Sequence, residues 1–359
     1  MNALAAVFDG AGKPMRIVDV PIPGKLNAGE VVVAISLATI CGSDLHTYSG
    51  RRFEAVPSIL GHEGVGRVIA AGAGREQWQG KRVTWISSAG CGNCAACTDW
   101  DLPQKCANVF KYGHAPLHDG CGLNGTYASH MLLRPGTHLV EVPEQVPDAV
   151  AASANCSLAT MANVTEFLPV PCKTAVIQGA GLLGLHGCAL LRAAGVRRVI
   201  FVDPDEARLA RVGVFGGEPC TSGELASRCA DVVIEASGAP SVIGEGLRML
   251  RPGGHYLLVG MVHPESALDI TGEAIIRGCV SMRGFHNYAP RHLDRAIEFL
   301  GGSSMPWESL VSPPLPLEQI EDGFALAASR RWARVAVKYE PQPEHCLSAL
   351  WTAATHRRF

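Results

Sequence analysis

The feature that most restricts the fold of this chain is a glycine pattern between an apolar strand-like run and an apolar helix-like run. Gly179, Gly181 and Gly184 form the pattern Gly-X-Gly-X-X-Gly. A strand is expected over 174–178 before the pattern, and a helix over 182–194 after it. In such a turn the first glycine allows the tight bend, the second lets the backbone approach a pyrophosphate, and the third lets helix and strand pack closely. The pattern in this context predicts a dinucleotide-binding parallel sheet.

An acidic residue stands where a contact to the adenosine ribose is expected. Asp203 ends the next expected strand, over 198–202, about 20 residues beyond the glycine turn. A carboxylate there accepts hydrogen bonds from the ribose hydroxyls and repels a 2′-phosphate, which favours NAD over NADP. Arg208 can pair near the same ribose or meet a phosphate, so NADP stays the less favoured alternative. The predicted cofactor-binding residues are Gly179, Gly181, Leu182, Leu183, Gly184, Asp203 and Arg208.

Four of the thirteen cysteines lie in one short loop. They follow the spacing Cys-X2-Cys-X2-Cys-X8-Cys, at Cys91, Cys94, Cys97 and Cys106. Zinc prefers four soft ligands in a tetrahedron, and a complete thiolate set leaves no position open for a substrate. The spacing therefore predicts a structural zinc site that holds an otherwise irregular loop.

A second group of candidate metal ligands stands apart from this loop. Cys41 and His62 lie in short polar segments, and Cys156 lies at the expected junction of two domains. A thiolate, an imidazole and a third ligand with one open position form a Lewis-acid zinc site that can bind an alcohol oxygen. Glu63, directly after His62, can take the third or fourth position when the coordination changes. The predicted ligands of a catalytic zinc are Cys41, His62, Glu63 and Cys156.

The length and the pattern of elements predict two domains. A chain of 359 residues is too long for one typical core. Short runs rich in valine and glycine, such as 30–35 and 66–70, predict a small β-barrel-like domain in the first segment. Expected strands over 231–236 and 255–259 continue an alternation of strands and helices that predicts a parallel, doubly wound sheet. The tail from 310 to 339 is expected to rejoin the first domain.

These motifs together resemble those of the zinc-containing medium-chain dehydrogenase/reductase superfamily. The similarity extends from Val31 to Tyr339. It rests on residues 41–46 and 61–63, the cysteine loop, residues 156–160, and the glycine pattern with Asp203. The last gap of the cysteine loop is X8, where many members of the superfamily have X7, so the loop near 99–101 is expected to differ.

The resemblance implies an α/β fold: a GroES-like β-barrel catalytic domain beside a Rossmann domain with a doubly wound parallel sheet. It assigns 1–157 and 285–340 to the first domain and 158–284 to the second, and leaves 341–359 as an unassigned C-terminal extension. It also implies a homodimer or homotetramer and one catalytic and one structural zinc ion in each subunit.

The resemblance further implies catalytic roles. Ser43 receives the alcohol proton and His46 passes it to solvent, while Glu63 stands beside the catalytic zinc. Asp44 orients His62, as expected for a partner of a metal-bound imidazole. Thr160 presses the nicotinamide ring towards the substrate. The implied reaction is the NAD(P)-dependent interconversion of an alcohol and its aldehyde or ketone.

Four basic residues indicate the class of substrate. They are Arg51, Arg52, Lys111 and His114. In the superfamily their segments line the substrate cleft, where cationic groups suit an anionic substrate. The sequences of residues 102–106 and 111–114 are similar to those of a subfamily associated with phosphonate catabolism. The hypothesis is therefore that the substrate is a hydroxyalkyl phosphonate or another phosphorylated or carboxylated alcohol.

Three alternatives stay open at this point. The basic residues can be solvated surface charges. The enzyme can be a polyol or amino-alcohol dehydrogenase of the sorbitol or threonine type. The chain can also be a catalytically inactive, zinc-stabilised nucleotide-binding protein.

Composition narrows the partners and the location. A net charge of −2 gives no basic field for nucleic acid or for a membrane surface. The N-terminal segment has no signal-peptide pattern, and the apolar runs are interrupted before the length of a bilayer span. The expectation is a cytoplasmic enzyme whose partner is a small molecule.

Overall fold

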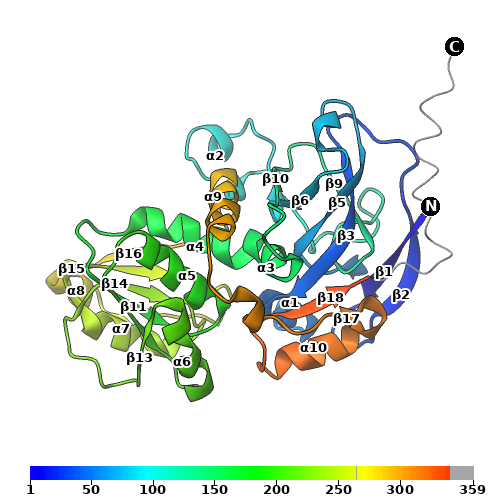
Figure 1. The fold of residues 1–359 in the computed structure, drawn as a ribbon. Helices are drawn as coiled ribbons and strands as arrows, with labels where there is room; N and C mark the ends of the chain where they lie inside the picture. Colours follow the sequence, from blue (N-terminus) through cyan, green and yellow to red (C-terminus); the bar gives the residue numbers. More distant parts are fainter. Residues whose placement is uncertain (264, 340–359) are drawn as a thin grey trace, which may run out of the picture.

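The computed structural model describes residues 1–263 and 265–339, and the predicted C-terminal extension over 341–359 lies outside them. Two bodies stand side by side, each built on its own sheets (Figure 1). One body combines the first part of the chain with strands near its end, and the other holds a six-stranded sheet. The α/β architecture predicted from the sequence is therefore confirmed.

The first body contains three sheets. The three-stranded sheet has the order β2 (Arg16–Pro21), β1 (Asn2–Phe8), β4 (Ser58–Ile59). The seven-stranded sheet has the order β10 (Leu139–Glu141), β6 (Arg82–Trp85), β5 (Glu63–Ala71), β3 (Val31–Ile40), β18 (Val335–Lys338), β17 (Leu315–Pro316), and β9 (His130–Leu133) also pairs with β3. The two-stranded sheet joins β7 (Ser88–Ala89) to β8 (Phe110–Lys111).

Strand β3 is the centre of this body. It pairs antiparallel with β5, β9 and β18. Its ten residues are rich in β-branched valine and isoleucine, which suit a strand buried on both faces. The expected strands over 30–35 and 66–70 are parts of β3 and β5. Because β18 lies between β3 and β17, the end of the described chain completes this sheet, as the sequence predicts.

The helices of the first body are short. They are α1 (Gly42–Tyr48), α2 (Ala95–Thr98) and α10 (Ile320–Ala328), with the 3-10 turns η1 (Glu76–Trp78), η2 (Pro103–Lys105), η7 (Trp307–Leu310) and η8 (Leu317–Gln319).

The second body is a parallel sheet with the order β13 (Glu218–Cys220), β12 (Arg198–Val202), β11 (Thr174–Gln178), β14 (Ala230–Glu235), β15 (Leu250–Leu258), β16 (Ser281–Gly284). Its helical elements are α5 (Leu182–Ala193), α6 (Glu206–Val212), α7 (Ile243–Met249) and α8 (Gly272–Gly278), with the 3-10 turns η5 (Gly213–Phe215) and η6 (Pro240–Val242). The strand order reverses between β11 and β14, and ligands bind beyond the carboxyl ends of strands at such a point in doubly wound sheets.

A helical segment connects the two bodies. It runs through α3 (Asp148–Ser153), the π-helical turn η3 (Ala154–Leu158), α4 (Ala159–Val164) and η4 (Thr165–Phe167), and α9 (Pro290–Gly301) packs against it. One apolar cluster extends across this segment, from Leu37 and Val65 of the first body to Leu185 and Phe201 of the second. The shared core fixes the wall of the cleft on which the candidate site is built. Within the described residues, no helix is long and apolar enough to cross a membrane.

Candidate active site

Four potential metal ligands meet at the edge of the connecting segment. Cys41 caps the start of α1, His62 and Glu63 lie at the start of β5, and Cys156 lies in the π-helical turn η3. One ligand atom from each lies within 4.8 Å of those of the others. A π-turn widens a helix by one residue and is frequent at functional sites. The fold thus brings together the four residues that the sequence predicts as ligands of a catalytic zinc.

The geometry of this group fits a zinc ion. The sulfurs of Cys41 and Cys156 are 3.9 Å apart. Two sulfurs about 2.3 Å from one zinc ion lie about 3.8 Å apart in a tetrahedron. The hydrogen bond from Cys156, with the nearby charge of Arg334 and the contact with His62, holds the pKa of the Cys41 thiol well below its usual value. A thiolate at Cys41 is the form that binds metal.

Asp44 orients both Cys41 and His62. Its Oδ1 lies 3.2 Å from His62 Nδ1. Its Oδ2 accepts hydrogen bonds from the backbone N–H of Cys41 at 2.9 Å and from the hydroxyl of Tyr127 at 2.8 Å. Asp44 is 2% exposed, so these contacts fix the imidazole and the thiol in a dry environment. Sequence reasoning missed Tyr127, because no local spacing connects it to Asp44.

Glu63 is held by a buried arginine that sequence reasoning also missed. Arg334 donates to Glu63 from Nε at 2.8 Å to Oε2 and from Nη2 at 2.8 Å to Oε1. Thr39 donates to Oε2 at 2.5 Å. Nη2 of Arg334 also lies 3.4 Å from the sulfur of Cys41. Burial raises the pKa of Glu63 to about 7, against the opposing charge of Arg334.

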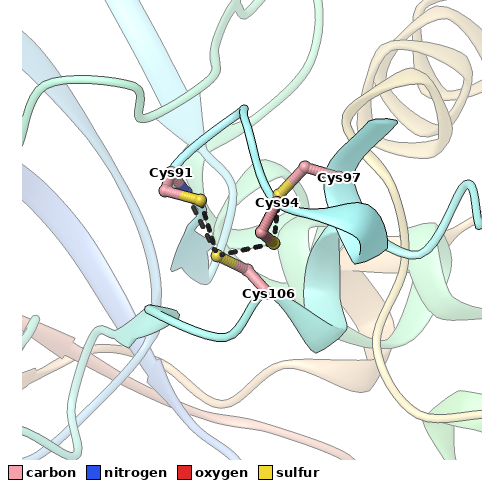
Figure 2. A group of neighbouring side chains, drawn as sticks. All are labelled: Cys91, Cys94, Cys97 and Cys106. Atoms are coloured by element: carbon pink, nitrogen blue, oxygen red, sulfur yellow. Dashed lines mark hydrogen bonds between the residues drawn. The ribbon is translucent and has the colours of Figure 1, made fainter. Parts of the chain in front are cut away.

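The four-cysteine loop forms a separate cluster (Figure 2). The sulfur of Cys106 lies 3.4 Å from that of Cys91 and 3.8 Å from that of Cys94, which lies 3.6 Å from that of Cys97. These separations are close to the tetrahedral value of about 3.8 Å. Four sulfurs fill the coordination sphere of a zinc ion, so this arrangement has no position for a substrate.

Two side chains tie the cysteine loop to the rest of the chain. Asp101 lies where the X8 gap adds a residue, and it has a left-handed φ of +54°. Its Oδ1 accepts from Arg291 of α9 at 2.8 Å, and Arg291 also reaches Glu166 at 3.1 Å. Lys105 Nζ lies 2.7 Å from Nδ1 of His286. The loop is therefore tied at two points to the stretch of chain that leads from β16 into α9.

A cavity of about 380 Å³ opens beside the Cys41 group. Ser43, His46 and Thr160 line it together with Cys41, His62 and Cys156. Nδ1 of His46 is buried and has no hydrogen-bond partner among the described residues. Leu183 of the glycine turn reaches the same cavity.

Three of the four predicted basic residues line this cavity. They are Arg52, Lys111 and His114. Burial lowers the pKa of His114, whose ring stacks on that of His62 with centroids 5.9 Å apart. Two further lining residues, Glu54 and His286, were not foreseen from the sequence. The signal that could have identified Glu54 is its charge, because it lies in the same charged segment after α1 as Arg52.

Arg51 lies apart from the other three basic residues, on a second cavity of about 200 Å³. Gly181 and Leu182 line the same cavity, and so do the side chains of Arg208 and Arg330. Arg51 therefore lies beside the glycine turn and not on the cavity that Arg52, Lys111 and His114 line.

The glycine turn has the close contacts expected of its pattern. Gly179 has φ +110°, and a Cβ atom on Gly184 would lie 2.1 Å from the carbonyl oxygen of Gly179. Asp203 accepts from the backbone N–H of Ala180 at 2.7 Å, and its Oδ2 lies 4.0 Å from Arg208. The acidic side chain therefore braces the glycine turn.

A buried carboxylate joins two loops at the carboxyl ends of β14 and β15. Glu235 Oε1 accepts from the N–H groups of Ser237 at 2.7 Å and Gly238 at 2.6 Å, and Oε2 accepts from the N–H of Gly260 at 2.9 Å. Ser237 and Gly260 both line the larger cavity. Glu235 is fully buried and was not foreseen from the sequence.

Comparison with known proteins decides the family. The model of the alcohol dehydrogenase GroES-like domain matches residues 27–144, and that of the zinc-binding dehydrogenase matches residues 183–301. A probable zinc-binding alcohol dehydrogenase of Mycobacterium tuberculosis is 30% identical over 358 residues, which cover 96% of this chain and 90% of the relative. The chain belongs to the zinc-dependent medium-chain dehydrogenase/reductase superfamily.

Other members of the superfamily are similar over most of this chain. The L-threonine 3-dehydrogenase of Thermococcus kodakarensis is 29% identical over 313 residues, covering 82% of this chain and 83% of the relative. The crystal structure of an alcohol dehydrogenase from Thermotoga maritima has a TM-score of 0.88 and 28% identity, covering 95% of this chain and 100% of that one. As a member of this superfamily the protein is a zinc-binding oxidoreductase of small molecules, which confirms that the predicted enzyme class is oxidoreductase.

Proposed function

We propose that the protein is a zinc- and NAD-dependent dehydrogenase that interconverts an anionic alcohol and its aldehyde or ketone. One observation carries the proposal: a single cavity is lined both by the Cys41–His62–Cys156 group and by the cationic residues Arg52 and Lys111. An alcohol oxygen at the metal-ligand group and an anionic group at the cationic residues would fix the substrate at two points.

The proposed chemistry assigns a task to each residue. Cys41, His62 and Cys156 would hold the catalytic zinc, which when bound supplies a Lewis acid for the alcohol oxygen. The hydroxyl of Ser43 accepts the alcohol proton, and His46, which lines the same cavity, moves the proton towards solvent. Glu63, which is paired with Arg334, would offer a carboxylate to the metal. In this proposal Cys91, Cys94, Cys97 and Cys106 hold the structural zinc.

The glycine turn is the proposed cofactor site. The second glycine, Gly181, and the N-terminus of α5 suit a pyrophosphate. Arg51 adds a positive charge on the same cavity. Asp203 favours the free ribose hydroxyls of NAD, whereas Arg208 keeps NADP as the alternative. Thr160 stands in the larger cavity, where it would support the nicotinamide ring.

An amino-alcohol or polyol dehydrogenase is the second candidate. The similarity to L-threonine 3-dehydrogenase favours it, together with the carboxylate of Glu54 in the cavity. The inactive nucleotide-binding alternative requires that this cavity has no catalytic function. Against it, Ser43, His46 and the metal-ligand group all line the one cavity. We also propose a homodimer or homotetramer, with the domain boundary at 157/158 and the return to the first domain at 285.

Steady-state kinetics tests the proposal. The purified zinc-loaded enzyme is given NAD or NADP with hydroxyalkyl phosphonates, hydroxy acids and uncharged polyols. Arg52→Ala and Lys111→Ala should each lower kcat/KM for anionic alcohols by about tenfold or more, because each removes a charge-assisted contact. Arg277→Ala, on an exposed face of α8, is the matched control.

The outcomes separate the candidates. Unchanged kcat/KM for every anionic alcohol in both variants contradicts the anionic substrate. Preference for uncharged polyols favours the second candidate. NADH binding with no alcohol-dependent turnover, in protein of full zinc content, favours the inactive alternative.

A further inference from the structure

A contact across 181 positions of the chain joins the cysteine loop to the wall of the larger cavity. Lys105 lies in η2, directly before Cys106, and His286 lies shortly beyond the end of β16. Nζ of Lys105 is 2.7 Å from Nδ1 of His286. His286 lines the cavity, whereas Lys105 does not. The lysine therefore supports a side chain of the cavity wall from outside the cavity.

This contact determines which ring nitrogen of His286 carries the hydrogen. A lysine ammonium group has donors but no lone pair, so Nδ1 of His286 is the acceptor. Burial, with the charge of Lys105, lowers the pKa of His286 to about 4, which leaves the ring neutral at neutral pH. In a neutral imidazole whose Nδ1 is an acceptor, the hydrogen is on Nε2. His286 is therefore an Nε2–H donor.

Nε2 of His286 is accessible. Within the part of the chain that the structure describes, only the other ring nitrogen, Nδ1, forms a hydrogen bond. Nor is Nε2 one of the buried polar atoms that lack a partner there, so this nitrogen is in contact with solvent. Because the side chain lines the cavity, we expect Nε2–H to meet a ligand that enters it.

His286 stands among the cationic residues of the cavity. The charges of Lys111 and Arg52 also lower the pKa of His286, so both residues lie close to it. Both line the same cavity and are the residues proposed to bind the anionic group of the substrate. A hydrogen bond is stronger and more directed when its acceptor is charged. A neutral N–H donor at this place adds such a bond to the attraction of the two cations.

We propose that His286 binds the anionic group of the substrate through Nε2–H, and that Lys105 is the positioning residue that keeps the hydrogen on this nitrogen. The inference rests on the proposed function, because it adds a contact to the anionic alcohol that the site is proposed to oxidise. The cysteine loop then contributes to substrate binding through Lys105, although none of residues 91–106 lines the cavity.

Substitution of His286 tests the contact with matched substrates. 3-Hydroxybutyrate is compared with 3-hydroxybutyramide, and 2-hydroxyethylphosphonate with its dimethyl ester, so that each pair differs mainly in charge. His286→Phe, which has no donor, should raise KM for the charged member by about tenfold and change kcat by less than about twofold. The neutral member should keep its kcat/KM within about twofold. His286→Gln, whose amide N–H can replace Nε2–H, should retain most of the affinity.

Nitrogen NMR of the zinc-loaded enzyme with isotope-labelled histidine tests the role of Lys105. The signals of His286 are assigned by their loss in His286→Gln. They should show a protonated Nε2 and an unprotonated Nδ1 in the parent enzyme. Lys105→Met should give a mixture of the two tautomers, whereas Lys105→Arg, which keeps a donor, should give the tautomer of the parent.

A double variant separates positioning by Lys105 from a direct effect of its charge. Lys105→Met should raise KM for the charged substrate by about threefold in the parent and cause no further rise in His286→Phe, because its effect passes through the imidazole. Lys25→Met, at an exposed lysine outside the cavity, is the control. Zinc content and thermal unfolding verify that the cysteine loop and the fold are intact in each variant.

The results distinguish failure of this inference from failure of the proposed function. Equal loss for the charged and neutral members in His286→Phe would assign His286 to packing of the cavity wall and overturn the inference, while the anionic-alcohol function stands. Hydrogen on Nδ1 in the parent enzyme overturns it as well. A further rise of KM in the double variant contradicts the positioning role of Lys105. Oxidation of neutral alcohols alone, with no anionic alcohol accepted, contradicts the proposed function and the inference together.

Discussion

Arg334 and Glu63 form a buried ion pair beside the proposed catalytic metal ligands, with two of their N···O distances at 2.8 Å. Glu63 is fully buried and Arg334 is 9% exposed. The guanidinium also approaches the sulfur of Cys41 at 3.4 Å. One arginine thus compensates both a carboxylate and a thiolate in a dry environment, and its loss would remove the positive charge that stands beside both groups.

Arg334→Met should destabilise the zinc-loaded protein by about 3–5 kcal/mol, because breaking a buried ion pair leaves an uncompensated charge. Urea unfolding measures the change, with Arg295→Met on the exposed side of α9 as a control. The double variant Arg334→Met with Glu63→Gln should recover part of the loss. A single variant within about 0.5 kcal/mol of the parent would show that the pair contributes nothing to stability.

Cys97→Ser should loosen the four-cysteine loop before it affects the parallel sheet. With three thiolates the loop would bind the proposed structural zinc less tightly, and we expect its irregular backbone to depend on that metal. Hydrogen exchange followed by mass spectrometry should show faster exchange over 91–111 and unchanged exchange in β11 and β14. Cys279→Ser, at an exposed cysteine of the second body, is the control. Equal exchange in both variants would argue that the loop is ordered without metal.

Glu235→Gln should weaken NADH binding by about tenfold. The carboxylate accepts three backbone N–H groups from the two loops at the carboxyl ends of β14 and β15, and an amide must turn its own N–H towards at least one of these donors. Fluorescence titration with NADH measures the affinity, and Glu273→Gln on the exposed face of α8 serves as the control. A normal Kd with a lowered Tm would assign Glu235 to stability alone.

His186 should make the protein less stable as the pH falls below neutrality. Burial, with the nearby charge of Arg334, lowers the pKa of His186 to about 3, so the folded state keeps a neutral ring where the unfolded chain takes up a proton near pH 6.5. The stability is fully present above pH 6.5 and is lost as the pH falls towards 3. Urea unfolding of the parent and of His186→Gln should show slopes that differ by about 1.4 kcal/mol per pH unit in this range. Parallel pH profiles for the two proteins would contradict the assignment.

Local patterns made much of the fold predictable from the sequence. The strands β11 and β12 have the bounds expected for them, because each is a short apolar run with turn residues on either side. The four-cysteine loop was also predictable, since its ligands lie within sixteen positions. Strand β15 begins at Leu250, earlier than the expected 255, because it continues through Gly253 and Gly254, which read as a turn in isolation.

Contacts between distant parts of the chain were not predictable in the same way. Cys156 entered the proposed metal site only through its place at the expected domain junction, since it lies more than a hundred positions from Cys41 and no spacing rule joins the two. Arg334 lies 271 positions from Glu63, and no spacing rule joins such a pair. Arg51 and Arg52 are neighbours in the sequence, but they line different cavities. The cavity that each side chain lines after α1 depends on the direction of the backbone there, and the composition of the segment does not predict that direction.

The position of β18 between β3 and β17 has a consequence for how the protein is made. Chains leave the ribosome from their N-terminus, and their domains generally fold in that order. Here the seven-stranded sheet is completed by β18, which is synthesised long after its neighbour β3. Arg334 directly precedes β18 and is synthesised equally late. A nascent chain that stops before residue 334 would hold Glu63 and Cys41 without their cation. The metal site is therefore expected to form late in biosynthesis. A chain that terminates prematurely should have no activity, because its metal site would be incomplete.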